Sequence, residues 1–323
     1  MKTHSLFPAT MALMLCCASL VCAGETLPRE STIRIMTFNI WSNGKAGKQP
    51  LSQTAKVIQM ANADIVGLQE ADAATVEVLS DILGQGWHHS GSILSRFRIV
   101  EKRGKGIKVR FDAGHEAFVF NNHFAHAPYQ PYQLLGIPYG SGKFIKTEEE
   151  AIAEANKARG HQVAALLKTT NAIPDKDLPI FVTGDFNEPS HQDWTANAAT
   201  AGRHPAKVSY PATRSLTEAG LVDAYRTAHP DEMRFPGYTW TPITKTTDLK
   251  NHHDRIDFIF FRGKTVKVES AQIVGENCNN ADIVVTPIRQ TTGRLSRPSR
   301  LPVQPKQSDM LTSRMQATTN SRA

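Results

Sequence analysis

Short stretches in which apolar and polar residues alternate recur along the chain, with the period of two that is typical of β-strands. The first is 31–41, STIRIMTFNIW, where Ile33 and Ile35 alternate with Arg34 and Met36. The same alternation, or a short apolar run between turn residues, predicts the other strands. These are 64–70, 92–102, 106–111, 116–124, 178–187, 254–263, 265–275 and 281–285.

Helices are predicted where apolar residues recur at helical spacing. The longest opens with Thr147, and Glu150 follows three residues later, which is a capping-box pattern. We expect helices over 52–63, 74–83 and 147–168, and a Pro/Tyr/Gly-rich loop over 125–146. Since some strands adjoin through short turns and others are separated by helices, the pattern favours an α/β protein with antiparallel or mixed sheets.

The N-terminal residues have the pattern of a secretory signal. Lys2 and His4 precede an apolar run over 11–23 that ends in small residues suited to signal peptidase. The run is short for a membrane span, so we predict that 1–23 is a cleaved signal peptide and that the protein is secreted or periplasmic. Three of the four cysteines lie within it, and Cys278 alone remains, so no internal disulfide is expected.

The chain has 323 residues and 40% hydrophobic composition, which is enough for one large domain or two small ones. Its net charge of +7 is unevenly spread. Residues 288–323 hold seven basic residues against the single acid Asp309, a net of +6, and Lys2 adds one more. Residues 24–287 are therefore formally neutral, and they give no electrostatic argument for a nucleic-acid partner. A monomer is expected.

Polar residues end several of the predicted strands, where strand termini commonly build sites. Taken one at a time, each has an ordinary structural explanation, such as a helix cap, an Asx turn or a hydrogen-bonded core histidine. A carboxylate inside an apolar strand is harder to explain, because burying it alone is costly. The strand-end residues are Asn39, Glu70, His123, Asp185 and Asn187, and the internal carboxylate is Asp257.

These residues belong to motifs that appear in a recognisable order. The chain reads TFNIW, DIVGLQE, NNHF, PIFVTGDFNEP and HDRIDFIFF, and in order and spacing it resembles the endonuclease/exonuclease/phosphatase superfamily. That superfamily includes deoxyribonuclease I, exonuclease III-type nucleases, bacterial sphingomyelinases and inositol polyphosphate 5-phosphatases. The resemblance covers 33–287, and we assign 31–287 to this domain. It implies a four-layered α/β sandwich of two packed mixed sheets flanked by helices, with the active site at one end.

The resemblance also implies a divalent cation, Mg²⁺ or Mn²⁺, and a role for each residue. Glu70 would be the metal ligand, with Asn39 beside it, and Asp185 would orient or deprotonate the attacking water. The remaining roles are as follows: Asn187 would hold the phosphate and that water, His123 would contact a non-bridging phosphate oxygen, and Asp257 would orient a second catalytic histidine. Placed nucleophiles and charge neutralisation are what phosphoester hydrolysis needs. His126 is an alternative to His123, and Asp254 is interpreted as a surface or supporting acid.

The substrate class is open between a phospholipid headgroup, a nucleic acid and a small phosphodiester. Aromatic residues on loops could line a groove for a sugar, base or headgroup, or could pack the loops, and packing is slightly favoured. They are Tyr129, Tyr132, Tyr238 and Trp240. The neutral body weakens the nuclease alternative, and no exposed apolar hairpin of a phospholipase is evident.

Members of the superfamily close with a strand carrying Ser/Thr-Asp-His, and this chain has no such motif. No histidine follows His253, and the only acid after Asp282 is Asp309. We therefore expect Asp257 to be buried without its histidine, a strand to be lost from a sheet edge, and activity to be low. The alternative is a catalytically inactive family member that acts as a binding protein.

The apolar run at 283–285 leads into a patternless basic segment, and we interpret 288–323 as a disordered tail produced by a frameshift. Permitted codons for 287–299 read, after restoration of one nucleotide, as Pro-Tyr-Pro-Thr-Asp-His followed by Arg-Ala-Val-Val-Ser-Thr-Phe. The shifted frame thus supplies both the missing motif and an apolar strand behind it. On this hypothesis the basic tail says nothing about binding partners.

Overall fold

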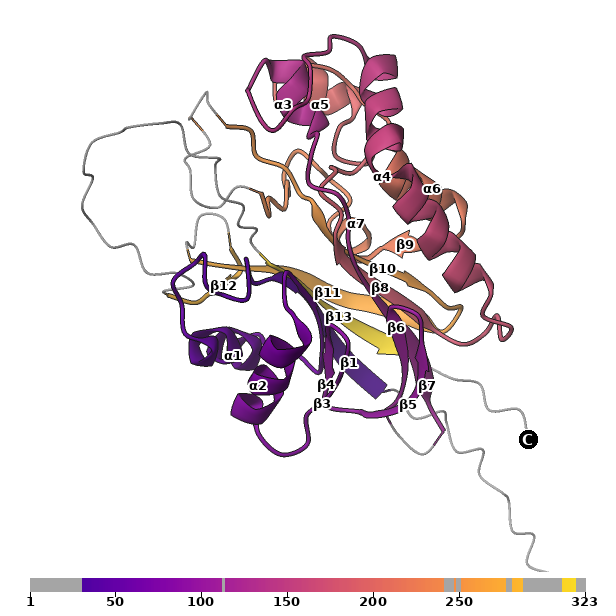
Figure 1. The fold of residues 1–323 in the computed structure, drawn as a ribbon. Helices are drawn as coiled ribbons and strands as arrows, with labels where there is room; N and C mark the ends of the chain where they lie inside the picture. Colours follow the sequence, from indigo (N-terminus) through magenta and orange to yellow (C-terminus); the bar gives the residue numbers. More distant parts are fainter. Residues whose placement is uncertain are drawn as a thin grey trace, which may run out of the picture.

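The computed structural model describes residues 31–111, 114–240, 247, 251–276, 281–286 and 310–317. Two β-sheets pack face to face, and helices cover the outer face of each (Figure 1). The arrangement is the four-layered α/β sandwich that the sequence predicts. Among the described residues, no helix combines the length and the apolar character that crossing a bilayer requires.

The first sheet has the strand order β12-β11-β13-β1-β2-β4-β3. Its strands are β1 (Ser31–Asn39), β2 (Ile65–Gln69), β3 (His88–Ser90), β4 (Ile93–Ser95), β11 (Val266–Gly275), β12 (Ile283–Val284) and β13 (Met310–Ala317). β1 and β2 are parallel, whereas β13 is antiparallel to both β1 and β11. The sheet is therefore mixed, as expected.

The second sheet has the strand order β5-β6-β7-β8-β10-β9. Its strands are β5 (Arg98–Arg103), β6 (Gly106–Arg110), β7 (Glu116–His123), β8 (Ile180–Asp185), β9 (Val222–Asp223) and β10 (Asp257–Arg262). β7 and β8 are parallel, and β10 is antiparallel to β8. This sheet brings three of the predicted motifs, NNHF, GDFN and RIDFIFF, onto neighbouring strands.

The helices in the described part of the chain are α1 (Leu51–Met60), α2 (Ala73–Leu83), α3 (Gln130–Leu135), α4 (Glu148–Asn171), α5 (Ala196–Thr200), α6 (Pro211–Glu218) and α7 (Ala224–Ala228). The helices α1 and α2 cover the outer face of the first sheet, and α4 and α6 cover that of the second (Figure 1). The helices α3 and α5 lie at one end beside the start of α4 (Figure 1), and α7 packs into the core between the sheets. α1 and α2 bury Val57 and Leu79 against the first sheet, and α4 and α6 bury Leu166 and Leu216 against the second. The predicted capping box at the start of α4 is present, with Thr147 accepting from the Glu150 N–H.

A third core lies between the sheets and explains the alternation of apolar residues. Ile33 and Ile35 of β1 pack there with Phe181 of β8 and Ile259 of β10. Met36 of β1, Val182 of β8 and Phe260 of β10 lie in the clusters beneath the helix layers, so these three strands carry apolar residues on both faces. Burial on both faces is what turns a simple alternation into a nearly continuous apolar run.

Two sequence predictions need correction. The expectation that 288–323 is disordered is wrong for Met310–Ala317, which forms β13 between β1 and β11 and so lies inside the sheet. The predicted loss of an edge strand is wrong for the same reason, because backbone groups of β1 and β11 pair with β13.

The predicted loop 125–146 contains the short helix α3. The predicted signal peptide 1–23 and residues 287–309 lie outside the described residues.

Candidate active site

The inner faces of the strands change from apolar to polar toward one end of the sandwich. Along β1 the inward positions begin with Ile33 and Ile35 and end at Asn39, and along β8 they begin with Phe181 and end at Asp185. Side chains two residues apart lie on the same face of a strand. The polar strand ends therefore project between the sheets, at the end of the interface where the apolar core stops.

Sheet register places the second-sheet residues side by side. His123 is the parallel partner of Asp185, and Asp257 is its antiparallel partner on the other side. In the first sheet Asn39 is the partner of Gln69, the residue before Glu70. The site residues of β7, β8 and β10 in the second sheet therefore lie at the same end of the sandwich as those of β1 and β2 in the first.

Asn39 joins the two sheets across this site. Its Nδ2 donates to Glu70 Oε1 at 3.1 Å and to Asp185 Oδ2 at 2.9 Å, so one amide group bridges two carboxylates. Asn39 and Asp185 are buried, with 2% and 1% of their surfaces exposed, whereas Glu70 is half-buried. The two carboxylates of the site are therefore held close together, with Glu70 nearer to solvent.

Glu70 is fixed by the loop that follows β1. The Ser42 N–H donates to Glu70 Oε2 at 2.9 Å, and the Asn43 N–H donates to the Glu70 carbonyl at 2.7 Å. Ser42, Asn43 and Glu70 all have positive φ, of 52°, 61° and 54°. Such angles are uncommon for these residue types and cluster at functional sites, because the surrounding contacts must hold them.

Asp185 lies at the centre of the site. The Asn187 N–H donates to Asp185 Oδ1 at 2.9 Å, and His123 Nε2 lies 3.6 Å from Asp185 Oδ2. Asn187 has a positive φ of 51°, and its Nδ2 donates to the Phe124 carbonyl at 2.9 Å. Buried Arg159 donates from Nε to the Asn187 carbonyl at 3.1 Å. The turn after β8 is therefore held from three sides.

His123 Nε2 is a buried nitrogen without a hydrogen-bond partner among the described residues. Buried polar atoms are nearly always paired, so an unpaired one at a strand end points to a role in binding. His126, the alternative histidine, is exposed, and its ring lies 6.3 Å from that of Tyr139. The structure brings His123, and not His126, beside Asp185.

Asp257 is fully buried at the first position of β10, with 0% of its surface exposed. Its N–H donates to Thr239 Oγ1 at 3.1 Å, and the neighbouring Ile256 N–H donates to the same oxygen at 3.0 Å. One threonine hydroxyl thus fixes the backbone at the start of β10. Asp257 is the antiparallel partner of Asp185, and the role expected for it, orienting a second histidine, stays a prediction.

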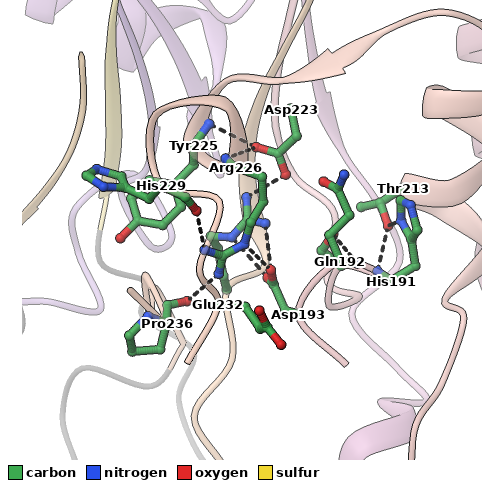
Figure 2. Close-up of polar contacts among 12 residues, drawn as sticks. His191, Gln192, Asp193, Thr213, Asp223, Tyr225, Arg226, His229, Glu232 and Pro236 are labelled. Carbon is green, nitrogen blue, oxygen red and sulfur yellow. Dashed lines mark hydrogen bonds and ion pairs between the residues drawn. The ribbon is translucent and has the colours of Figure 1, made fainter. Parts of the chain in front are cut away.

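A buried ionic network anchors the segment just before β10 (Figure 2). The Asp193 carboxylate accepts from Arg226 Nε at 2.6 Å and from Arg255 Nε at 3.0 Å, and Arg255 also reaches Asp223 Oδ2 at 2.8 Å. Burial alone would raise the pKa of Asp193, but Arg255 and Arg226 outweigh it and hold that pKa below its usual range. Arg255 lies two residues before Asp257, so this network fixes the approach to the site.

A second polar network lies between the sheets, and it was not predicted from the sequence. Gln69 Nε2 donates to Asn121 Oδ1 at 2.6 Å and to Thr37 Oγ1 at 3.0 Å, and Thr183 Oγ1 donates to Asn121 Oδ1 at 3.0 Å. Gly67 lies against it, because a Cβ there would collide with Thr183 and Asn121. In the sequence, a polar residue stands two positions before each of Asn39, His123 and Asp185, and this pattern could have indicated the network.

An open groove of about 670 Å³ runs past Glu70 and His123. Its walls are mostly small and polar, and they include the acids Glu70 and Asp72 and the exposed base Lys105. The lining that carries polar groups is Ser42, Asn43, Gln69, Glu70, Asp72, Ser90, Ser92, Lys105, Asn121 and His123. The groove lacks the excess of positive charge that binds long polyanions.

The loop aromatics serve mainly for packing. Tyr129, Tyr132 and Trp240 are buried together, and the Tyr132 hydroxyl accepts from Trp240 Nε1 at 3.1 Å. Tyr238 is half-buried, and its ring lies 5.7 Å from that of His253. The favoured packing interpretation agrees with this burial.

Tyr139 is an aromatic residue near the site that the sequence reading missed. Burial raises the pKa of Tyr139, and the nearby Tyr132 hydroxyl and the Asp185 and Glu70 carboxylates raise it further. The Tyr139 phenol is therefore neutral at physiological pH. It lies in the loop 125–146, where no strand pattern marked it.

Away from Glu70, the described residues include a group of possible metal ligands. His204, His252 and Asp254 each offer a ligand atom within 4.8 Å of the others. Burial lowers the pKa of His204 to about 4, so this imidazole is neutral at physiological pH. Asp254 is 2% exposed, so its interpretation as a surface acid is wrong.

Comparison with known proteins establishes the class. The sequence model of the endonuclease/exonuclease/phosphatase family matches residues 36–279, and the chain belongs to this family. An uncharacterized protein from Caenorhabditis elegans is 30% identical over 280 residues, which cover 79% of this chain and 86% of that protein.

Solved structures share the fold. A family protein from Beutenbergia cavernae has a TM-score of 0.53 at 15% identity, with 89% of this chain and 72% of that chain covered. One from Bacteroides thetaiotaomicron has a TM-score of 0.51 at 16% identity, with 90% and 96% covered. Truncated TDP2 from Caenorhabditis elegans has a TM-score of 0.51 at 15% identity, with 89% and 98% covered.

Proposed function

We propose that this chain is an exported, divalent-metal-dependent phosphoesterase that hydrolyses phosphodiester bonds. The observation that carries the proposal is the amide of Asn39, which bridges Glu70 at 3.1 Å and Asp185 at 2.9 Å where the strands end. His123 lies beside them, 3.6 Å from Asp185. Two carboxylates, an amide and an imidazole held together where the strands end are groups that phosphoester hydrolysis uses.

The donor set fits Mg²⁺ or Mn²⁺. Glu70 offers a half-buried carboxylate, and Asp185 Oδ2 lies close by because it accepts from the same Asn39 amide nitrogen as Glu70 Oε1. Hard divalent cations prefer oxygen ligands and are usually held by one or two carboxylates, with several waters retained. When bound there, the ion supplies charge neutralisation at the phosphoryl oxygens.

The chain's own residues have separate tasks. Asp185 is oriented by donors from Asn39 and from the Asn187 N–H, so it can hold an attacking water and accept its proton. The uncommitted Nε2 of His123 can donate to a non-bridging phosphate oxygen. Asn187 holds the other side of the phosphate from the strained turn after β8.

The groove supports a small polar phosphodiester as substrate. Its lining combines serines and two asparagines with two acids and a single lysine, Lys105. A polyanion would be repelled by Glu70 and Asp72 as much as it would be attracted by that lysine. Turnover of bis(p-nitrophenyl) phosphate, of a single-stranded oligonucleotide and of sphingomyelin vesicles, compared at one enzyme concentration, separates the three substrate classes.

Hydrolysis of bis(p-nitrophenyl) phosphate with Mg²⁺ and with EDTA tests the proposal. We expect EDTA, Glu70→Gln and Asp185→Asn each to lower the rate at least about 100-fold. Glu77→Gln, at an exposed position of α2, is the matched control and should leave the rate unchanged. A rate that is insensitive to EDTA and to Glu70→Gln would overturn the assignment.

The second candidate is a binding protein without turnover. It is favoured by the sequence itself, in which no histidine follows His253 to serve as the second catalytic histidine. On that alternative the wild-type chain shows no hydrolysis with any metal, yet binds Mn²⁺ at Glu70 in a titration that Glu70→Gln abolishes. Export is tested separately, by N-terminal sequencing of secreted material, which should begin after residue 23 and not at Met1.

A further inference from the structure

A second group of possible metal-ligand atoms lies where the segment after α5 meets the segment before β10. His204 Nδ1 and His252 Nε2 are 2.9 Å apart, and His252 Nε2 is 3.8 Å from Asp254 Oδ1. His204 follows α5, whereas His252 and Asp254 precede β10 by a few residues. Two distant parts of the chain therefore bring three ligand atoms together.

Asp254 is held as metal-binding carboxylates are held. Its Oδ1 accepts from Trp194 Nε1 at 2.7 Å, and its Oδ2 accepts from the Tyr129 hydroxyl at 2.6 Å. Such outer hydrogen bonds fix the orientation of a ligating side chain and leave a lone pair directed at the ion. Both donors are neutral, so the negative charge of Asp254 is not cancelled by them.

The two imidazoles are also positioned by packing. The Trp194 ring stacks on His204 at 4.3 Å with an interplanar angle of 12°, and His204 is 5% exposed. The neighbouring Arg203 donates to the carbonyls of Glu232 and Met233 and so directs its charge elsewhere. The negative charge of buried Asp254, beside two imidazoles, is therefore not neutralised by Arg203, and such a site suits a cation.

We propose that His204, His252 and Asp254 bind one borderline transition-metal ion of the Zn²⁺ type. Two imidazole nitrogens and one carboxylate are a common zinc ligand set, with water in the fourth position. Ligand atoms about 2.0–2.1 Å from a tetrahedral ion lie about 3.4 Å apart, and the observed 2.9 and 3.8 Å bracket that spacing. Nitrogen ligands disfavour Mg²⁺, so this site differs in metal from the Glu70 site.

The ion would connect two segments that flank the active site. Asp254 forms backbone hydrogen bonds with Trp240 in both directions, at 2.8 and 2.6 Å, so the two residues are paired as an antiparallel β-bridge. Asp257 lies three residues further along and begins β10. Binding at His204 would therefore tie the entry of β10 to the segment after α5, which is a stabilising role independent of the phosphoesterase proposal.

The test uses the full chain, loaded with Zn²⁺ or Co²⁺ and desalted. We expect one Zn²⁺ per chain by mass spectrometry of metals, and intense visible absorption of tetrahedral Co²⁺, in the wild type and in Glu70→Gln. His252→Gln should lower Zn²⁺ affinity more than about 100-fold and abolish the Co²⁺ bands, because it removes a ligand. His89→Gln, at an exposed position of β3, is the matched control.

Three results would overturn the proposal. The first is a wild-type chain whose Co²⁺ spectrum lacks tetrahedral bands, which needs no variant to fold. The second is Zn²⁺ binding that Glu70→Gln removes and His252→Gln leaves unchanged. The third is an unchanged thermal transition of the wild type on addition of Zn²⁺, since a ligand that binds the folded state raises its stability. Mg²⁺-dependent hydrolysis by His252→Gln, measured in parallel, separates this outcome from failure of the phosphoesterase proposal.

Discussion

Replacing Asp193 by Asn should destabilise the protein strongly, because this carboxylate pairs with the buried Arg226 (Figure 2) and also with the buried Arg255. Arg226 and Arg255 are 6% and 1% exposed, and their contacts with Asp193 are 2.6 and 3.0 Å long. Asn keeps the shape of the side chain but removes the charge. Arg255 then retains Asp223 as its only ionic partner in this network, and Arg226 retains only backbone carbonyls.

The size of the effect follows from burial. Removing one partner of a buried ion pair costs about 3–5 kcal/mol, because the other charge stays buried without compensation. For a protein of this size such a loss lowers the melting temperature by about 5–10 °C. Urea denaturation followed by circular dichroism measures the free energy of unfolding directly.

The effect should depend on pH. The pKa of Asp193 is depressed in the folded state, so its contribution is fully present above the unfolded pKa of about 4 and is lost as the pH falls through the lower folded value. The difference in unfolding free energy between wild type and Asp193→Asn should therefore be flat from about pH 5 to 8 and shrink below about pH 4.

Asp177→Asn is the matched control. Asp177 pairs with Lys264 at 3.3 Å, but the two side chains are 79% and 87% exposed, so the change should be within about 0.5 kcal/mol. Equal losses for the two variants would refute the reasoning that burial decides the cost. A loss for Asp193→Asn that does not vary with pH would refute the assignment of the effect to charge.

Three further predictions concern the packing at Gly67, the role of His123 and the reading frame of the gene. Gly67→Ala should lower the free energy of unfolding by about 1–3 kcal/mol or more and lower activity, since the added Cβ would collide with Thr183. The control Gly160→Ala in α4 should raise the free energy of unfolding by about 0.5–1 kcal/mol. Urea denaturation of both variants measures these changes. His123→Ala should lower kcat and leave KM for bis(p-nitrophenyl) phosphate nearly unchanged, because its contact forms mainly in the transition state, and an equal rise of KM would contradict this. Sequencing the gene should show codons for 288–299 that read Thr-Asp-His in the shifted frame, and the repaired protein should hydrolyse faster by about 100-fold or more; codons that cannot give this motif end the frameshift hypothesis.

Most strands of the fold could be predicted from the sequence, because the strand periodicity and the order of the motifs agree. The strands carrying Asn39, His123, Asp185 and Asp257 were located within a few residues. Those of His123, Asp185 and Asp257 are neighbours in the second sheet, and that of Asn39 lies in the facing first sheet. Periodicity failed for β13, whose sequence Met310–Ala317 has no clear alternation and pairs through its backbone. Short helices such as α5 also escaped, because one turn and a half carries too little pattern.

The site was predictable as a set of residue types, but not as a geometry. Motif order could suggest Glu70 and Asp185 together, whereas the amide of Asn39 that bridges them depends on two sheets facing each other. The Asp185 and Glu70 carboxylates influence the pKa of Tyr139 although it is far from them in the sequence, and no local sequence pattern indicates that. The His204 group was invisible for the same reason, since its members are about fifty residues apart in sequence.

A crystal structure of the chain soaked with Mn²⁺ and inorganic phosphate tests the central claim most directly. Anomalous scattering locates the metal without reference to activity. The account predicts a Mn²⁺ peak on the Glu70 carboxylate, beside Asn39, with phosphate oxygens within hydrogen-bond distance of His123 Nε2 and the Asn187 side chain. Mn²⁺ and phosphate bound elsewhere, with Glu70 still accepting from Asn39 and Ser42 alone, would contradict it.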